Sequence, residues 1–170
     1  MWCRLYESAL QYVGWPIVPG FDFAGIVEWA GADTEFTEGD EVFGFTMFGA
    51  YSNHILVPAS QIRKKPINLS LEVSSALPAV AATALHALSL AGGYPGPLVT
   101  RNKAALIHSA AGGVGSMLIQ MCKLQGFSPV VAVVGSKHKI LFCKELGADF
   151  VIDKSSVDLW TAAKQISPTG

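Results

Sequence analysis

The sequence has little charge, little cysteine and no long uninterrupted apolar run. Its 170 residues carry 12 Lys and Arg against 13 Asp and Glu, and only 15% of them are charged. A net charge of -1 excludes the strongly basic surface that binds nucleic-acid phosphates. Three cysteines, an odd and sparse number, exclude a scaffold built on disulfides.

Membrane and export signals are also missing. The longest apolar stretch, Ala76 to Ala91, contains Pro78 and several polar residues, so it falls short of the roughly 18 clean residues that a membrane span needs. Arg4 and Glu7 interrupt any apolar core of a secretory signal. We therefore expect a cytoplasmic protein with reduced thiols.

Apolar residues are abundant, at 51% of the chain with a mean hydropathy of +0.39. A chain this apolar can bury enough surface to offset its ordering entropy, which excludes disorder. Such a composition is typical of an α/β sheet covered on both faces, whose strands form continuous apolar runs.

The chain changes character near residue 70. Before it, short β-like runs separated by Gly and Asp predict an antiparallel, barrel-like unit, with strands over Phe23–Trp29, Glu41–Thr46 and Ala50–Val57. The first fourteen residues could form one helical face.

After residue 70 the pattern is helical from Leu71 to Leu90 except at Pro78, and the loop Gly92–Pro97 ends it. Strands then alternate with helices, which predicts βαβ units and a parallel sheet. The expected strands are Ala104–His108, Val130–Val134 and Phe150–Ile152, and the expected helices are Gly112–Leu124, Ser136–Leu146 and Val157–Ile166.

A cluster of small residues lies between the first strand of this alternating region and its helix. Small residues let a backbone approach a pyrophosphate, and a helix N-terminus offers unpaired N–H groups to it. A tight turn without a ligand is the alternative. The candidate cofactor-binding residues here are Ser109, Ala110, Ala111, Gly112, Gly113, Val114 and Gly115.

The end of the second strand should contact the adenosine ribose, where an NAD site carries Asp or Glu. Here the chain reads Gly135-Ser136-Lys137-His138-Lys139, without an acid. Cations suit a 2′-phosphate and favour NADPH over NADH. The alternative is that the two lysines are solvated residues at a helix start, although a cation there is slightly disfavoured by the helix dipole.

Seven motifs follow one another in a fixed order from Trp15 onward: Pro19–Val27, Gly39–Gly44, Gly49–His54, Thr83–Leu88, Ala110–Gly115, Lys144–Asp149 and Val151–Asp153. In this order they resemble the medium-chain dehydrogenase/reductase superfamily, and most closely its zinc-free quinone oxidoreductase and enoyl reductase branch. This resemblance implies an α/β chain with a partial GroES-like β-barrel domain at 1–78 and the first half of a Rossmann doubly wound parallel sheet at 79–170.

Zinc is not expected. Zinc-dependent relatives carry Gly-His-Glu where this chain has Gly20-Phe21-Asp22, and phenylalanine cannot ligate a metal. Cys3, Cys122 and Cys143 are isolated, without the Cys-x-x-Cys spacing of a structural zinc site.

The resemblance further implies hydride transfer from NADPH to a quinone or an α,β-unsaturated carbonyl compound. Thr83 matches a threonine near the nicotinamide, and Ser136 and Lys139 match residues near the 2′-phosphate. Lys154 stands where relatives have tyrosine, and Ser109 replaces their first turn glycine. Tyr51 either lines the substrate side or packs inside the barrel. Thr83 and Tyr51 are candidate pocket residues, and no catalytic residue is assigned.

Relatives extend further at both ends, so the chain is expected to be truncated and self-associating, and relatives are often dimers. Two functions remain open: an NADPH-dependent oxidoreductase acting on a small molecule, or a non-catalytic remnant serving as a nucleotide-binding or interaction module.

Overall fold

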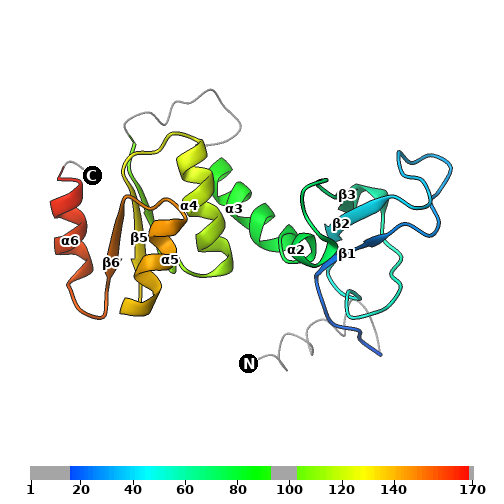
Figure 1. Cartoon of the computed structure of the whole chain (residues 1–170), viewed down its shortest axis with the longest axis horizontal. Helices are drawn as coiled ribbons and strands as arrows, with labels where there is room; N and C mark the ends of the chain where they lie inside the picture. Colours follow the sequence, from blue (N-terminus) through cyan, green and yellow to red (C-terminus); the bar gives the residue numbers. More distant parts are fainter. Residues whose placement is uncertain (1–15, 93–102, 169–170) are drawn as a thin grey trace. The chain divides into compact units, whose positions relative to one another are not determined.

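The computed structural model describes residues 16–92 and 103–168. The chain divides into two compact units, residues 1–79 and 80–170, which are considered separately (Figure 1). The expectations for residues 1–14, for Cys3 and for the loop at 93–97 lie outside the described residues. Within those residues, no helix has both the length and the apolar character needed to cross a membrane.

Unit 1 is built on a three-stranded antiparallel sheet in the order β1-β2-β3. Its strands are β1 (Asp22–Ile26), β2 (Glu41–Phe45) and β3 (Ile62–Lys64). Phe36, Val42 and Ile62 form its small core. The short helix α2 (Leu71–Ser75) is capped at its N-terminus by Ser70, whose hydroxyl accepts a hydrogen bond from the Val73 N–H.

The prediction of a strand over Ala50–Val57 is wrong. This segment runs without regular structure, and the third strand is β3, which follows the 3₁₀ turn η1 (Ala59–Gln61). Leu56, at 88% exposure, has no covering layer. The apolar composition of the segment suggested a strand, but within residues 16–92 and 103–168 the segment joins neither sheet.

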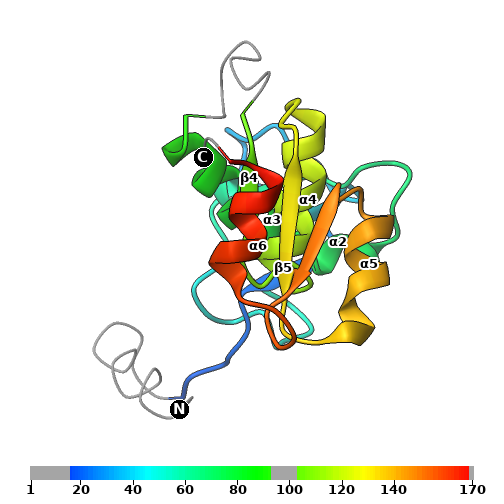
Figure 2. The ribbon, with the colours of Figure 1, turned by 90° about the vertical axis from the view of Figure 1, so that its left-hand side faces the viewer.

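Unit 2 contains a parallel three-stranded sheet in the order β4-β5-β6. Figure 2 shows α4 and α5 on one face of this sheet and α6 on the other. The elements after α3 (Pro78–Leu90) are β4 (Ala105–Ile107), α4 (Gly113–Leu124), β5 (Val130–Val134), η2 (Lys137–Lys139), α5 (Ile140–Glu145), β6 (Phe150–Asp153) and α6 (Leu159–Ile166).

The core of unit 2 follows the sequence pattern closely. All five residues of β5 are buried, as expected for the middle strand of a covered parallel sheet. Ile119 and Cys122 on α4, together with Cys143 on α5, pack into the same cluster. Burial raises the pKa of the Cys122 thiol to about 11, so this cysteine behaves as a small apolar residue.

The α/β fold class is confirmed, with parallel strands in the order that βαβ units produce. The expected helical break at Pro78 is also confirmed, because α2 ends at Ser75 and α3 begins at Pro78. The expected helix Ser136–Leu146 is shorter, since its first turn is the 3₁₀ turn η2 and α5 begins only at Ile140.

Candidate functional site

The small-residue turn joins the end of β4 to the start of α4. Gly112 is the residue before the helix and supplies no side-chain cap. The Ser116 N–H donates to the Gly112 carbonyl at 2.8 Å. The N–H groups of Gly113, Val114 and Gly115 therefore precede the first helical hydrogen bond and have no acceptor within the helix. They can bind an anion at the positive end of the helix dipole.

The glycines of this turn are required by close packing. A Cβ atom on Gly113 would lie 2.8 Å from the Cγ1 of Val80, and one on Gly115 would lie 2.7 Å from the Cα of Ala110. Ala110 is fully buried and its N–H donates to the Val133 carbonyl at 3.1 Å. The turn is thereby held against β5, with Gly112 and Gly113 exposed.

Ser109 occupies the left-handed region, with a φ of 51°. Glycine adopts this conformation without cost, whereas another residue is strained by roughly 1–2 kcal/mol. The Ser109 carbonyl accepts a hydrogen bond from the Gly112 N–H at 2.9 Å, which closes the turn. The serine that departs from the family pattern thus keeps a glycine-like backbone.

Four of the predicted residues meet at the carboxyl end of β5. Gly135 follows the strand, Ser136 precedes η2, and Lys139 closes that turn through its N–H to the Ser136 carbonyl at 3.2 Å. The Lys154 N–H donates to the Val134 carbonyl at 3.0 Å, which places Lys154 beside Gly135 although 19 residues separate them in the sequence.

Thr83 lies on α3 and is exposed. Val80, one turn earlier on the same helix, contacts the position of Gly113. Residues three apart are neighbours on the surface of a helix. The place of Thr83 beside a nicotinamide stays a prediction.

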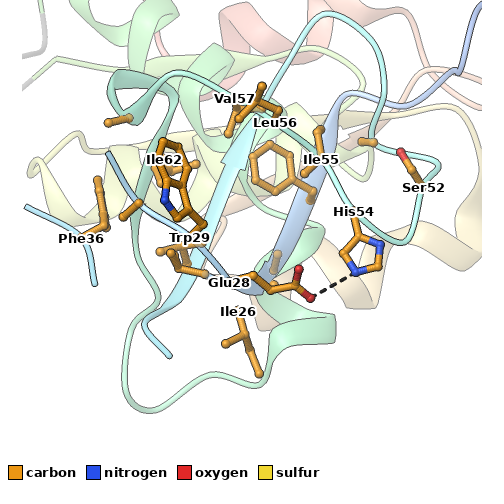
Figure 3. A pocket seen from close by; sticks show the side chains of 18 of the residues that line it. Ile26, Glu28, Trp29, Phe36, Ser52, His54, Ile55, Leu56, Val57 and Ile62 are labelled. Carbon is orange, nitrogen blue, oxygen red and sulfur yellow. Dashed lines mark hydrogen bonds and ion pairs between the residues drawn. The ribbon is translucent and has the colours of Figure 1, made fainter. Parts of the chain in front are cut away.

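Unit 1 holds a separate pocket of about 580 Å³ alongside β1. Figure 3 shows the apolar side chains of Trp29, Phe36 and Leu56 around it and the Glu28–His54 pair nearby. Nε2 of His54 lies 3.1 Å from Oε1 of Glu28, and both side chains are exposed. Sequence reasoning missed this pocket because residues 50–57, which form one wall of it, were assigned to a strand.

Tyr51 is at the edge of that pocket and is 78% exposed. The reading of Tyr51 as a packed barrel aromatic is therefore wrong for the described residues, since no layer covers the segment that carries it. The alternative, that Tyr51 lines the substrate side, stays a prediction.

The residues at the family's zinc position are engaged elsewhere. Phe21 packs against Phe48 with ring centroids 6.1 Å apart. Oδ1 of Asp22 accepts a hydrogen bond from the Ala79 N–H at 2.6 Å, at the start of α3. Across residues 16–92 and 103–168, no group of three or more His, Cys, Asp or Glu side chains is placed to hold a metal ion.

Comparison with known proteins identifies both parts of the chain. Residues 2–67 match the model of the alcohol dehydrogenase GroES-like domain, and residues 113–169 match that of the zinc-binding dehydrogenase domain. The first match begins at residue 2, earlier than the motifs from Trp15 onward had indicated.

Three similar proteins illustrate the relationship. The chain is 36% identical over 148 residues to the 2-methylene-furan-3-one reductase of Solanum lycopersicum. This match covers 81% of the present chain and 37% of the reductase. It resembles the quinone oxidoreductase of Pseudomonas syringae with a TM-score of 0.79 and 32% identity, over 91% of this chain and 46% of that one. It also resembles the Escherichia coli quinone oxidoreductase complexed with NADPH, with a TM-score of 0.80 and 27% identity. That match covers 99% of this chain and 51% of the Escherichia coli chain.

The matched domains and the fold define a class, the oxidoreductases that join a GroES-like domain to a dinucleotide-binding sheet. The chain belongs to the medium-chain dehydrogenase/reductase superfamily, with quinone oxidoreductases among its structural neighbours. It spans about half or less of the length of the relatives described above.

Proposed function

We propose that the protein is an NADPH-dependent oxidoreductase that transfers hydride to a quinone or an α,β-unsaturated carbonyl compound without zinc. The observation that carries this proposal is the turn before α4, where three backbone N–H groups without helical acceptors lie beside a strand end rich in lysine. The neighbour complexed with NADPH and the reductase among the relatives support it.

Each part of the chain has a defined task in this proposal. The N–H groups of Gly113, Val114 and Gly115 bind the pyrophosphate, and Ser136 with Lys139 binds the ribose phosphate. Ser109, Ala110, Ala111 and Gly112 shape the turn, and Thr83 orients the nicotinamide. When bound, NADPH supplies the hydride.

Tyr51 is the candidate residue on the substrate side. Its exposed ring and phenolic hydroxyl suit contact with a planar carbonyl compound. We further propose that the protein acts in the cytoplasm on a small molecule, that it binds no nucleic acid, and that it assembles as a homo-oligomer.

The test is oxidation of NADPH by the purified protein, with a panel of quinones and an enoyl thioester as acceptors. We expect turnover with at least one acceptor class, and loss of NADPH binding when Gly113→Val drives a side chain into Val80 and distorts the turn. Gly25→Ala is the matched control, since a Cβ there meets nothing within 4 Å.

Binding of NADPH without turnover of any acceptor would contradict the proposal that the protein is an enzyme. It would favour the alternative, a non-catalytic nucleotide-binding module. Absence of NADPH binding by the folded wild-type protein would contradict both.

A further inference from the structure

The pocket of unit 1 has a preformed apolar floor. Phe36, Val42 and Ile62 line it and are also the buried core of that unit. Trp29 and Leu56 line it as well and are largely exposed, so a ligand in contact with them would cover apolar surface that now faces water. The volume of about 580 Å³ lies within the range of small-molecule sites. The pocket thus has the size and the lining of a site for a small organic molecule.

The carboxylates around this pocket have no cationic counterpart in its lining. Asp22 and Glu28 line it, and none of the described lining residues is Lys or Arg. Unit 1 has the same bias, because residues 16–79 contain eight Asp and Glu against three Lys and Arg, a net charge of -5 with histidine counted as neutral. A cleft lined by charge of one sign attracts counter-ions. The pocket therefore favours a cation.

The three cations of residues 16–79 are engaged away from the pocket. Nζ of Lys64 lies 3.0 Å from Oδ2 of Asp40, and Nζ of Lys65 lies 3.0 Å from Oε2 of Glu41. Arg63 donates hydrogen bonds to backbone carbonyls of its own segment. These contacts leave the carboxylates of the pocket without a compensating Lys or Arg among the described residues of the unit.

Glu28 is the lining acid that can accept the ammonium group of a ligand. Its Oε1 lies 3.1 Å from Nε2 of His54, and its side chain is 74% exposed. Its Oε2 has no partner among the described residues. Asp22, by contrast, is partly buried, and its Oδ1 accepts the hydrogen bond from the Ala79 N–H. The contact with His54 therefore orients the Glu28 carboxylate and leaves one of its oxygens open.

Aromatic rings strengthen the preference for a cation. Four aromatic side chains line the pocket: Phe23, Trp29, Phe36 and Tyr51. The face of an aromatic ring carries partial negative charge, so it attracts an ammonium group and disfavours a carboxylate. Figure 3 shows the Glu28 carboxylate turned toward His54 and the Trp29 indole turned away from that pair. A molecule whose ammonium group lies at Glu28 can therefore pack its apolar part on the rings.

We infer that the pocket of unit 1 is a binding site for a small amphipathic amine, whose ammonium group pairs with Glu28 and whose apolar body packs on Trp29 and Leu56. The inference goes beyond the proposed function, because it requires neither a dinucleotide nor hydride transfer.

The test compares three probes that share one apolar body and differ in charge: phenylbutylamine, phenylbutanol and phenylbutyrate. Each is titrated into the 170-residue chain in dilute solution without nucleotide, at about pH 8, where an alkylamine is protonated and histidine is ordinarily neutral. Intrinsic tryptophan fluorescence reports binding. We expect the amine to bind about fivefold more tightly than the alcohol, the gain of one solvent-accessible ion pair, and phenylbutyrate to bind most weakly.

Two variants assign the binding to this pocket. Glu28→Gln keeps the shape of the side chain and removes its charge, and we expect it to bring the amine within about twofold of the alcohol without changing the affinity for the alcohol. Glu38→Gln is the matched control, because Glu38 is an exposed acid of the same unit that does not line the pocket. Trp29→Phe should remove most of the fluorescence change, although three other tryptophans remain. Circular dichroism checks that each variant is folded.

Several results would overturn the inference. The amine and the alcohol bind the wild-type chain equally well, or neither binds. Glu28→Gln keeps the full preference for the amine, or the fluorescence change survives in Trp29→Phe, which places the probe elsewhere. Loss of the preference in Glu38→Gln as well would assign it to the overall charge of unit 1 and not to Glu28. None of these results bears on the oxidation of NADPH, so the proposed function stands or fails separately.

Discussion

At the residue scale, Gly115 is the position in the turn that tolerates least change. It is buried at the start of α4, where a Cβ would press against the Cα and carbonyl carbon of Ala110. These are backbone atoms of a fully buried residue. We expect Gly115→Ala to lower the free energy of unfolding of unit 2 by about 1–3 kcal/mol, as overpacking in a tight core does. Urea denaturation followed by circular dichroism measures this.

Gly135→Ala is the control for that prediction. It adds the same methyl group in the same unit, but the new Cβ makes only an ordinary contact with the Cε of Lys154. Its free energy of unfolding should stay within about 0.5 kcal/mol of the wild type. Equal stability of the two variants would show that the crowding at Gly115 is relieved by movement of the turn.

At the scale of elements, Asp149 ties three of them together before β6 begins. Oδ2 accepts from the Val130 N–H at 2.7 Å, at the start of β5, and Oδ1 accepts from the Lys123 ammonium group at 2.7 Å, at the end of α4. Burial opposes ionisation of Asp149, but the hydrogen bonds from Lys123 and Val130 outweigh it, so the pKa of Asp149 lies below its ordinary value of 3.8.

A lowered pKa gives this carboxylate a defined pH signature. Its contribution to stability is full above the unfolded pKa of 3.8 and is lost as the pH falls through the lower folded pKa. Asp149→Asn keeps a hydrogen-bond acceptor but removes the charge. We expect it to lower the free energy of unfolding by about 1 kcal/mol at neutral pH, a modest value because Lys123 and Asp149 are both partly exposed. Urea midpoints measured from neutral pH into acid should converge for the two proteins below pH 3.8.

Glu145→Gln, at the exposed end of α5, is the matched control and should change neither the midpoint nor its pH dependence. A constant difference between Asp149→Asn and the wild type across the whole pH range would show that the charge of Asp149 contributes nothing.

The sequence predicts the helices and strands of unit 2 more completely than those of unit 1. In unit 2, β5 is buried along its whole length, and α4 and α5 both bury apolar residues in the cluster around it, so local pattern and burial agree. In unit 1, residues 50–57 have a strand-like composition but pair with none of the strands in the described part of the chain. Strand propensity reflects packing against neighbours, which one segment of sequence does not contain.

The cation cluster at the end of β5 was predictable only in part. Ser136 and Lys139 follow β5 directly and could be assigned from their position in the sequence. Lys154 comes after the next strand, and its proximity to Gly135 depends on the parallel register in which Val134 is paired with Asp153. That register is a tertiary property of the sheet, so proximity of this lysine was implied by family resemblance and not by spacing.

At the scale of the whole molecule, the pocket of unit 1 is a place where exposed apolar side chains lie together. Ile26, Trp29 and Leu56 line it at 58%, 77% and 88% exposure. Contiguous exposed apolar surface in a soluble protein promotes association. β1 is also an edge strand of its sheet, and unpaired backbone groups along an edge add a second route to pairing between copies.

We therefore expect the 170-residue chain to self-associate in a concentration-dependent way through this surface. Trp29→Ser combined with Leu56→Ser should shift the sedimentation profile toward the monomer, because it removes two of the exposed large apolar side chains that line the pocket. Leu124→Ser is the matched control: Leu124 is 82% exposed on α4 in unit 2 and is not one of the residues that line the pocket. A wild-type chain that sediments as a monomer at all concentrations, or a control variant that dissociates as readily as the double variant, would refute the assignment to this surface.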